Sequence, residues 1–307
     1  MKELPIQLKL PSNFLNEEIR CDYYITSDMK KVWSVQLDLL SVFDTVCREN
    51  DIKYYVCAGT LLGAMRHKGY IPWDDDVDVM VFREDYDKLC KLALTSFKDP
   101  YFFQTEYTDP GSIRGHAQLR NSETTAIVEA EQNNNFPFNQ GIFIDIFVLD
   151  NVPDDDSLRM KYFRKARKLK KLYTFIRDVT WGINRSSGIV GFVKETLIST
   201  KKILGLSFES QNPNSAYCKW EKHIKKYDSI KTEWVMIMAL DSDRFCWKRE
   251  WFCEPEYVPF EFLEVPIPKY YDEVLIKTYK NWHVMVHEAS GHKSVIYNTE
   301  RSYKDLQ

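Results

Sequence analysis

The sequence lacks several features that would place the protein in a common class. Its seven cysteines are odd in number and include no C-x-x-C pair, which argues against a disulfide framework or a zinc knuckle. The N-terminus shows no basic segment followed by an apolar one, so we expect no signal peptide. No uninterrupted apolar run reaches the roughly 18 residues that would predict a membrane span. Reduced thiols packed as small apolar groups, in a cytoplasmic protein, are the simplest expectation.

The overall charge of the chain gives no indication of a nucleic-acid partner. The formal net charge is −3 and the sequence pI is about 6.1, so no overall attraction to nucleic acid is expected. We find no internal repeat and no low-complexity tract. The 307 residues, 44% of them hydrophobic, suffice for one large domain or for a catalytic domain with a helical addition.

The stretch from Ala58 to Phe82 is the most informative part of the chain. It predicts a Gly-Thr turn, a short helix, a loop ending near Pro72 and a strand that begins with acids. Asp76 and Asp78 lie two residues apart, so on a strand both side chains point to one face. Like charges about 4 Å apart repel by about 4 kcal/mol at an effective dielectric of about 20. A divalent cation removes that repulsion, and Mg²⁺ is typically held by one or two carboxylates and by substrate phosphates.

A solvated acidic loop is the alternative interpretation of this run. Against it, the acids lead directly into the apolar residues of a strand, which normally means burial. A calcium-binding loop does not fit either, because Val79 stands where the motif needs Gly and Asp85 where it needs Glu. Gly59 and Thr60 open a helix just upstream, and backbone amides at a helix start bind anions. We therefore expect a phosphate chain between that turn and a metal ion.

Residues 59–79 read Gly-Thr-Leu-Leu-Gly-Ala-Met-Arg-His-Lys-Gly-Tyr-Ile-Pro-Trp-Asp-Asp-Asp-Val-Asp-Val, and the run Arg-Glu-Asp-Tyr follows at 83–86. This long motif resembles the LicD family of phosphotransferases, which is similar in turn to fukutin-related protein and to nucleotidyltransferases of the polymerase-β type. A weaker likeness continues through 141–150 and returns at 263–268 and 291–292.

The resemblance implies both a fold and an activity. The fold is α/β, a nucleotidyltransferase-type mixed β-sheet with flanking helices and a helical insertion. The activity is metal-dependent transfer of a substituted phosphate, such as phosphocholine, from a CDP-alcohol such as CDP-choline. The acceptor is a hydroxyl of a cell-surface glycan, a teichoic acid or a lipopolysaccharide precursor, which can be lipid-linked. The expected metal is Mg²⁺ or Mn²⁺, and no nucleic-acid partner is expected.

Asp145 is the most informative acid outside this motif. It stands between Ile144 and Ile146 in an apolar strand, where a carboxylate is costly without a partner. A strand-end acid that caps a turn or pairs with an arginine is the alternative. The resemblance implies a third carboxylate beside Asp76 and Asp78, one that helps to hold the metal or takes the proton from the attacking hydroxyl.

Four more residues are candidate substrate contacts. The guanidinium of Arg66 can form bidentate hydrogen bonds to phosphate oxygens, although a salt bridge to Asp74 or Asp75 is an equal alternative. Trp73 can stack on a base or sugar, although core packing is the default for such a side chain. Asp75 orders the acidic loop or joins the metal. The resemblance implies that His292 contacts substrate, but the next residue is a lysine where the family commonly has a second histidine.

A cluster of basic residues marks the middle of the chain. Residues 161–171 predict an amphipathic helix with a dense basic face, whose interpretations are a solvated surface, contact with an anionic acceptor, or peripheral contact with the inner membrane surface. We therefore divide the chain into a catalytic core at 1–153, a helical insertion for acceptor binding at 154–230, and a part at 231–307 that completes the catalytic domain.

Periodicity and turn signals predict the remaining elements. Residues 1–25 form an arm that packs on the domain. Strands are expected at Ile52–Cys57, Val77–Phe82, Tyr101–Tyr107, Ile142–Leu149, Trp234–Leu240 and Glu261–Ile267, with a hairpin that joins His116–Asn121 to Thr124–Glu129. Helices are expected from an N-cap at Ser27 to Asn50, and at Arg83–Phe97, Asp156–Val179, Gly188–Leu206, Ser215–Tyr227 and Tyr270–Tyr279.

Two other functions remain open at the level of sequence. The first is a nucleotidyltransferase that attaches NMP to an acceptor with the same acids. The second is a non-catalytic glycan-binding protein that retains a relict transferase fold. The intact acids and the Gly-Thr turn argue against this second alternative.

Overall fold

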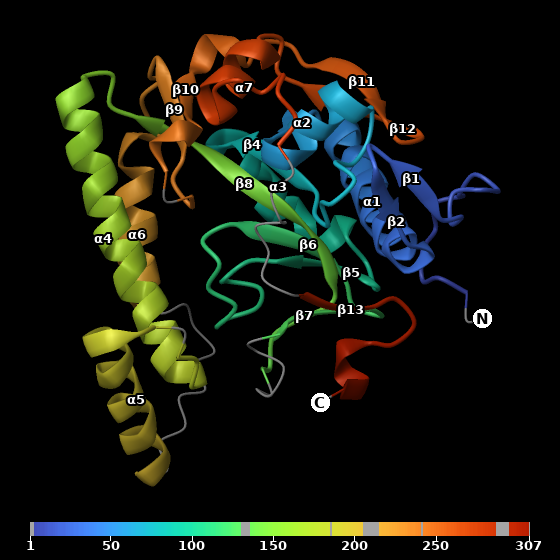
Figure 1. Ribbon diagram of the computed structural model, residues 1–307. Helices are drawn as coiled ribbons and strands as arrows, with labels where there is room; N and C mark the ends of the chain where they lie inside the picture. The colour runs from blue at the N-terminus through green and yellow to red at the C-terminus, as the bar shows by residue number, and fades with distance from the viewer. Residues whose placement is uncertain are drawn as a thin grey trace.

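A mixed β-sheet forms the centre of the protein, as the sequence predicts (Figure 1). The computed structural model describes residues 3–129, 136–184, 186–204, 215–240, 242–286 and 295–306. Within them, the strands of the seven-stranded central sheet are β3 (Tyr54–Val56), β4 (Asp78–Phe82), β5 (Tyr101–Gln104), β6 (Ala117–Asn121), β8 (Ile142–Val152), β9 (Trp234–Ile237) and β10 (Cys246–Lys248).

The long strand β8 organises this sheet. One of its edges pairs in parallel with β4, which pairs in turn with β3 in the antiparallel sense. Its other edge pairs first with β6 and then with β9, both antiparallel. Strands β5 and β10 extend the sheet beyond β6 and β9. Acids at the start of β4 and in β8 are therefore brought together across one parallel strand pair.

Helices flank the sheet, and shorter paired strands lie around it (Figure 1). The helices are α1 (Ser27–Glu49), α2 (Ala58–His67), α3 (Arg83–Ser96), α4 (Asp156–Trp181), α5 (Gly188–Ile203), α6 (Ser215–Ile224) and α7 (Tyr271–Tyr279). The peripheral strands pair as β1 (Glu18–Arg20) with β2 (Tyr23–Ile25), β7 (Thr125–Val128) with β13 (Val295–Asn298), and β11 (Glu256–Phe260) with β12 (Leu263–Ile267).

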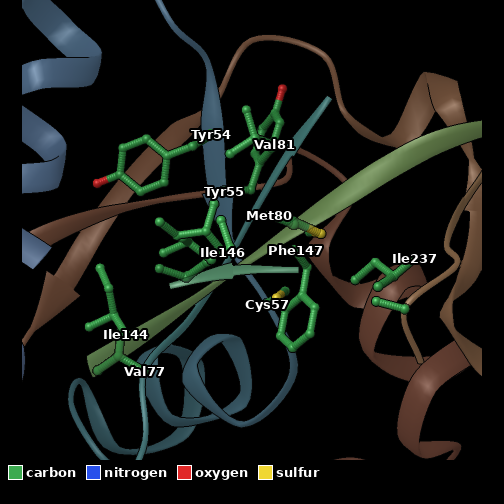
Figure 2. Packing of buried hydrophobic residues seen from close by; sticks show 14 of the residues in the cluster. Tyr54, Tyr55, Cys57, Val77, Met80, Val81, Ile144, Ile146, Phe147 and Ile237 are labelled. Atoms are coloured by element: carbon green, nitrogen blue, oxygen red, sulfur yellow. The ribbon is translucent and has the colours of Figure 1, made fainter. Parts of the chain in front are cut away.

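One continuous apolar core fixes the sheet to its helices. Figure 2 shows Val81 of β4 and Ile146 of β8 packed beside Tyr54 of β3. On that face of the sheet, the ring of Tyr54 meets Phe43 of α1 edge to face at 5.0 Å. Phe147 projects from β8 on the opposite face, the face that also carries Asp145, because successive strand residues alternate between faces.

The N-terminal arm packs on the domain as predicted. The backbone amides of Gln7 and Leu8 donate to Asp38 Oδ1 of α1 at 2.9 and 2.8 Å. Arg20 in β1 forms an ion pair of 2.7 Å with Glu261, which lies between β11 and β12. The arm is thereby attached to α1 and to the turn between β11 and β12.

Two local predictions were wrong. The N-cap of α1 is Thr26 rather than Ser27, because Thr26 has the extended backbone of a cap and its Oγ1 accepts a hydrogen bond from the Met29 amide at 3.1 Å. The hairpin of β6 with β7 does not form either. Strand β6 already pairs with β5 on one edge and β8 on the other, so β7 has no free edge there and pairs with β13 instead.

The predicted middle helices are present as α4, α5 and α6. Helices α4 and α6 lie beside the sheet, and α5 lies against one end of α4 (Figure 1). The division of the chain at 153 and 230 stays a prediction. Among the described helices, none combines the length and the apolar character needed to span a bilayer.

All seven cysteines are free thiols, as expected. Cys47, Cys57 and Cys246 are buried as small apolar groups, whereas Cys253 is exposed and does not fit that expectation.

Candidate active site

Two buried acids face each other across the parallel strand pair. Asp78 begins β4, and Asp145 of β8 is its partner in the register. Parallel strands lie about 4.8 Å apart, and residues in register point to the same face of the sheet. Asp78 is 8% exposed and Asp145 is 6% exposed. The expectation that Asp145 lies on a neighbouring strand is therefore confirmed for Asp78. Asp76 was expected on the same strand, but it lies before β4, which begins only at Asp78.

The start of α2 is tied to the start of β4. The amide of Asp78 donates to Thr60 Oγ1 at 2.8 Å, and the amide of Cys57 donates to the Asp78 carbonyl oxygen at 3.0 Å. Thr60 therefore has a positioning role that the sequence did not reveal, because its hydroxyl holds the backbone of an acid. Its backbone amide, with those of Ala58 and Gly59, belongs to the first turn of α2, where amides lack an intrahelical acceptor.

Gly59 allows an acid to approach this helix start. A Cβ at that position would lie 2.5 Å from Asp74 Oδ2, closer than real Cβ contacts allow. The carboxyl group of Asp74 thus lies against the first turn of α2, where helix amides favour negative charge. The helix start at which an anion site was predicted is present, and the chain's own carboxylate lies beside it; phosphate binding there stays a prediction.

The acids form a crowded cluster. Burial, followed by the charges of Asp76 and Asp75, raises the pKa of Asp74 to about 8. Burial and the charges of Asp76, Asp145 and Asp74 likewise raise the pKa of Asp78 well above its usual range. Asp74 also shares a hydrogen bond with Asp76, which requires one of the two carboxyl groups to keep a proton. Ionising all of these carboxyl groups together is therefore costly in the absence of a positive charge.

Asp145 differs from the other acids because donors surround it. Its Oδ1 lies 2.8 Å from His116 Nε2 and accepts a hydrogen bond from Gln118 Nε2 at 2.6 Å. The fully buried Arg120 donates in turn to the side-chain oxygen of Gln118. Burial tends to raise the pKa of Asp145, but His116, Gln118 and the charge of Arg114 bring it below the ordinary value. Asp145 is therefore a fixed carboxylate.

His116 and Gln118 are residues that the sequence analysis missed. Gln118 lies in β6 opposite Asp145 in the register, and His116 directly precedes that strand, so both side chains reach the Asp145 carboxylate. A signal was present, because Gln118 and Arg120 alternate with the apolar Ala117 and Leu119 in a strand that is buried throughout, and His116 continues the alternation just before it.

The C-terminal part supplies two tyrosines that were also missed. Burial and the charge of Asp78 raise the pKa of Tyr279 in α7. Tyr297 in β13 donates to Asp75 Oδ2 at 3.1 Å, and its pKa is raised by burial and by the charge of Asp75. Neither residue belongs to a local motif, so only the fold brings them to the acids.

Asp75 and Trp73 are placed in the structure by protein contacts. The carbonyl oxygen of Asp75 accepts a hydrogen bond from Gln36 Nε2 of α1 at 2.7 Å, which fixes the acidic loop on that helix. Trp73 packs edge to face against Tyr23 of β2 at 6.0 Å. These contacts suit residues that order the loop, and their contact with substrate stays a prediction.

Arg66 is not brought to the acids. Arg66 lies in the last turn of α2, at the opposite end from Gly59, and burial rather than a neighbouring carboxylate dominates its environment, since burial lowers its pKa. Its Nη2 is buried without a hydrogen-bond partner in the described part of the chain. His292 lies outside the described residues, so its predicted role is not tested.

The acids suit a hard divalent cation by their chemistry. Asp76, Asp78 and Asp145 offer carboxylate oxygens, the donors that Mg²⁺ and Mn²⁺ prefer. In the described ranges no three His, Cys, Asp or Glu side chains are already grouped as they would be around a bound metal. Mg²⁺ usually takes one or two carboxylates and completes its shell with water and substrate phosphates, so the Asp78–Asp145 pair with Asp76 beside it remains compatible with such an ion.

Comparison with known proteins agrees with this geometry. The profile described as LicD/FKTN/FKRP, nucleotidyltransferase domain, matches residues 51–143, which include the start of α2, Asp76 and Asp78. Asp145 follows two residues beyond the match.

Three relatives share parts of the chain. The lipopolysaccharide cholinephosphotransferase LicD of Haemophilus influenzae is 31% identical over 136 residues, which cover 44% of this chain and 49% of that protein. An uncharacterized protein of Rickettsia prowazekii is 45% identical over 60 residues, 20% of each chain. Another from Rickettsia typhi is 57% identical over 37 residues, 12% of each chain. The chain thus spans about half the length of the Haemophilus relative and a smaller share of the two Rickettsia proteins. Residues 51–143 match the nucleotidyltransferase-domain profile of the family that the motif resembles.

Proposed function

We propose that the protein transfers a substituted phosphate, phosphocholine or a close analogue, from a CDP-alcohol to a glycan hydroxyl. The observation that carries this proposal is the in-register pairing of Asp78 with Asp145, next to Asp76 and to the start of α2. The Haemophilus relative, a lipopolysaccharide cholinephosphotransferase, supports the phosphocholine donor and a glycan acceptor of that class.

The reaction has a simple bond balance. An acceptor hydroxyl oxygen attacks the phosphorus that carries choline, a new P–O bond forms, and the P–O bond to CMP breaks. CMP leaves with the bonding electrons, and the hydroxyl proton passes to a base. Charge builds on the phosphate oxygens as this happens, so the site has to counter it.

Each part of the site has a role in that scheme. Asp76, Asp78 and Asp145 would hold Mg²⁺ or Mn²⁺, which supplies charge neutralisation at the phosphates. The first-turn amides of α2, which include those of Gly59 and Thr60, bind the phosphate chain. The hydroxyl of Thr60 fixes the backbone of Asp78, so the amides and the acids keep their relative position.

Asp145 suits charge binding better than proton removal. An efficient general base has a pKa near the working pH. The hydrogen bonds from His116 and Gln118 act in the opposite direction and lower the pKa of Asp145. We assign to it the orientation of the metal and, through His116, a link to the neighbouring strand. The cytoplasmic location and the teichoic acid or lipopolysaccharide acceptor belong to the same proposal.

A labelled-donor experiment tests the proposal. The full chain is incubated with Mg²⁺, a glycan acceptor and either CDP-choline labelled in choline or CTP labelled in its α-phosphate. We expect choline label on the acceptor together with release of CMP. Incorporation of the CTP label would instead indicate an NMP-transferring enzyme, and incorporation of neither label over a panel of CDP-alcohols and acceptors would favour a non-catalytic glycan-binding protein.

A further inference from the structure

Helix α5 is amphipathic in the reverse sense to an ordinary surface helix. Ile189, Phe192 and Ile203 are 84%, 75% and 83% exposed. The exposed positions on this side carry no charged side chain: Ile189, Val190, Phe192, Val193, Thr196, Leu197, Ser199, Thr200, Ile203 and Leu204. We call these residues the outer face of α5. Surface helices normally place their apolar stripe against the core and their charges outward.

The side of α5 that packs on α4 holds a charged pair instead. Lys194, only 5% exposed, forms an ion pair of 2.6 Å with Asp178, which is 4% exposed. The Nζ atom of Lys194 also lies 5.6 Å from the ring centre of Phe175 in α4. Lys201 donates to the carbonyl oxygen of Thr180, again in α4. The orientation of the helix is therefore fixed by polar contacts that direct its apolar side outward.

A basic surface lies on the same side of α4. Arg164, Lys168, Lys171, Phe175 and Asp178 follow each other at spacings of three and four, so they form one stripe along that helix. Helix α5 contacts the Phe175–Asp178 end of the stripe, and the exposed basic residues occupy the other end (Figure 1). We define the basic surface as Lys161, Arg164, Lys165, Arg167, Lys168 and Lys171.

The positive charge of this surface is not compensated by the described part of the protein. None of its six side chains forms an ion pair with a described acid, and together they line an open hollow of about 600 Å³. Between Asp156 and Asp178 the sequence contains no acidic residue. The basic surface therefore stays unpaired beside an exposed apolar helix. This combination is complementary to an apolar layer bordered by anionic groups.

We propose that α4 and α5 dock the protein on an anionic lipid surface. The outer face of α5 enters the boundary between headgroups and acyl chains, and the basic surface of α4 contacts anionic headgroups. This arrangement would hold the enzyme at the membrane without a spanning helix. The inference does not depend on the proposed transfer activity, because docking needs neither donor nor acceptor.

Vesicle co-flotation of the full chain tests this proposal. The probes are vesicles of phosphatidylcholine alone and of phosphatidylcholine mixed with phosphatidylglycerol. We expect the wild-type protein to float with the mixed vesicles and to bind the neutral ones much less. Added salt should weaken binding to the mixed vesicles, because it screens the headgroup charge.

Two variants separate the parts of the surface. Arg164→Gln with Lys168→Gln and Lys171→Gln should weaken binding to mixed vesicles roughly 100-fold, since each basic side chain near an anionic surface contributes about five-fold. Ile189→Gln with Phe192→Gln should weaken it by at least about 10-fold, because α5 then has less apolar area to insert. All five side chains are exposed, so circular dichroism and the unfolding midpoint should match the wild type.

Matched controls change the same chemistry elsewhere. Lys91→Gln with Lys98→Gln and Lys277→Gln removes three exposed charges, and Leu94→Gln with Ile276→Gln removes two exposed apolar side chains on other helices. Both controls should bind vesicles as the wild type does. The proposal is overturned if the outer-face variant floats as well as the wild type. It is also overturned if light scattering without lipid shows a dimer that the same variant dissociates, because the outer face would then cover a second copy.

Discussion

The acid cluster and the α4–α5 helix pair place charge and apolar surface in opposite ways. At the sheet, Asp78 and Asp145 lie in apolar surroundings and crowd negative charge into the interior. In the helix pair, Lys194 and Asp178 neutralise each other inside while apolar side chains face outward. The first region has unbalanced charge and the second has uncovered apolar area. Each therefore indicates a partner of its own kind, a cation with phosphates for the sheet and a lipid surface for the helices.

Replacing Asp78 should have the largest effect, and it should lower activity while it raises the stability of the metal-free protein. Asp78→Asn keeps the shape of the side chain but removes a charge that the site needs, so we expect transfer to fall by at least about 10²-fold. A matched Asp87→Asn, at a half-buried acid of α3 that pairs with Lys225, should keep full activity. Initial rates of CMP release measure both variants. Activity near the wild-type level in Asp78→Asn would mean that Asp78 does not take part in the transfer reaction.

The same substitution should stabilise the protein freed of metal by a chelator. Burial and the neighbouring acids raise the pKa of Asp78 above its ordinary value near 3.8, so the ionised form destabilises the fold. The free energy of unfolding of the variant should exceed that of the wild type by an amount that grows as the pH rises above about 3.8. At lower pH the two should converge, because the carboxyl group is then protonated in both the folded and the unfolded chain. Urea unfolding at several pH values gives this difference.

Breaking the buried ion pair of Lys194 with Asp178 should destabilise the helix pair, whereas Asp78→Asn stabilises the metal-free protein. Lys194→Met leaves Asp178 with Arg177 at 2.8 Å as its remaining partner, and loss of one member of a buried pair costs about 3 kcal/mol. Amide hydrogen exchange should accelerate in α5 while β4 and β8 stay protected. Lys202→Met, an exposed lysine of the same helix, is the control. Equal exchange in both variants would mean that the pair does not hold α5.

The support of Asp145 should have an intermediate effect. His116→Ala removes a hydrogen-bond partner that orients the carboxylate, and loss of such a partner typically costs 10- to 100-fold in metal affinity or activity. The half-saturating concentration of Mg²⁺ should rise along with the fall in rate. A fall in rate at unchanged Mg²⁺ dependence would place His116 in contact with substrate instead.

Two glycines of α2 should give the smallest effects and the clearest contrast. Gly59→Ala places a Cβ against the carboxyl group of Asp74, a side chain that can shift, so we expect about 10-fold loss of activity with little change in stability. Gly63→Ala places a Cβ against the backbone oxygen of Gly69, which cannot move aside, and should cost about 1–3 kcal/mol of stability. Thermal unfolding and transfer rates of the two variants test the contrast.

The sequence predicted those parts of the site that local patterns encode. An acid in an apolar strand pointed to Asp145, and the register of β4 with β8 confirms where it lies. The hydroxyl of Thr60 could not be assigned from the motif, because its partner is the backbone of a residue eighteen positions away. Tyr279 and Tyr297 meet the acids only through folding of the chain ends.

The errors and the helix pair show a second limit of local patterns. Periodicity correctly indicates α5 as an amphipathic helix, but it does not say which side meets the protein. The ion pair of Lys194 with Asp178 decides that, and it reverses the usual orientation. Strand β7 was assigned correctly as a strand but to the wrong partner, because pairing depends on which edges of the sheet remain free.

Calorimetric titration of CDP-choline tests the central claim most directly. The claim is that Asp78 and Asp145, paired across β4 and β8, hold a divalent cation against the donor phosphates. We predict that the wild-type protein binds CDP-choline tightly only with Mg²⁺, and that Asp78→Asn and Asp145→Asn lose this metal-dependent binding while they remain folded. Equal binding by the wild type and both variants, with or without Mg²⁺, would contradict the claim.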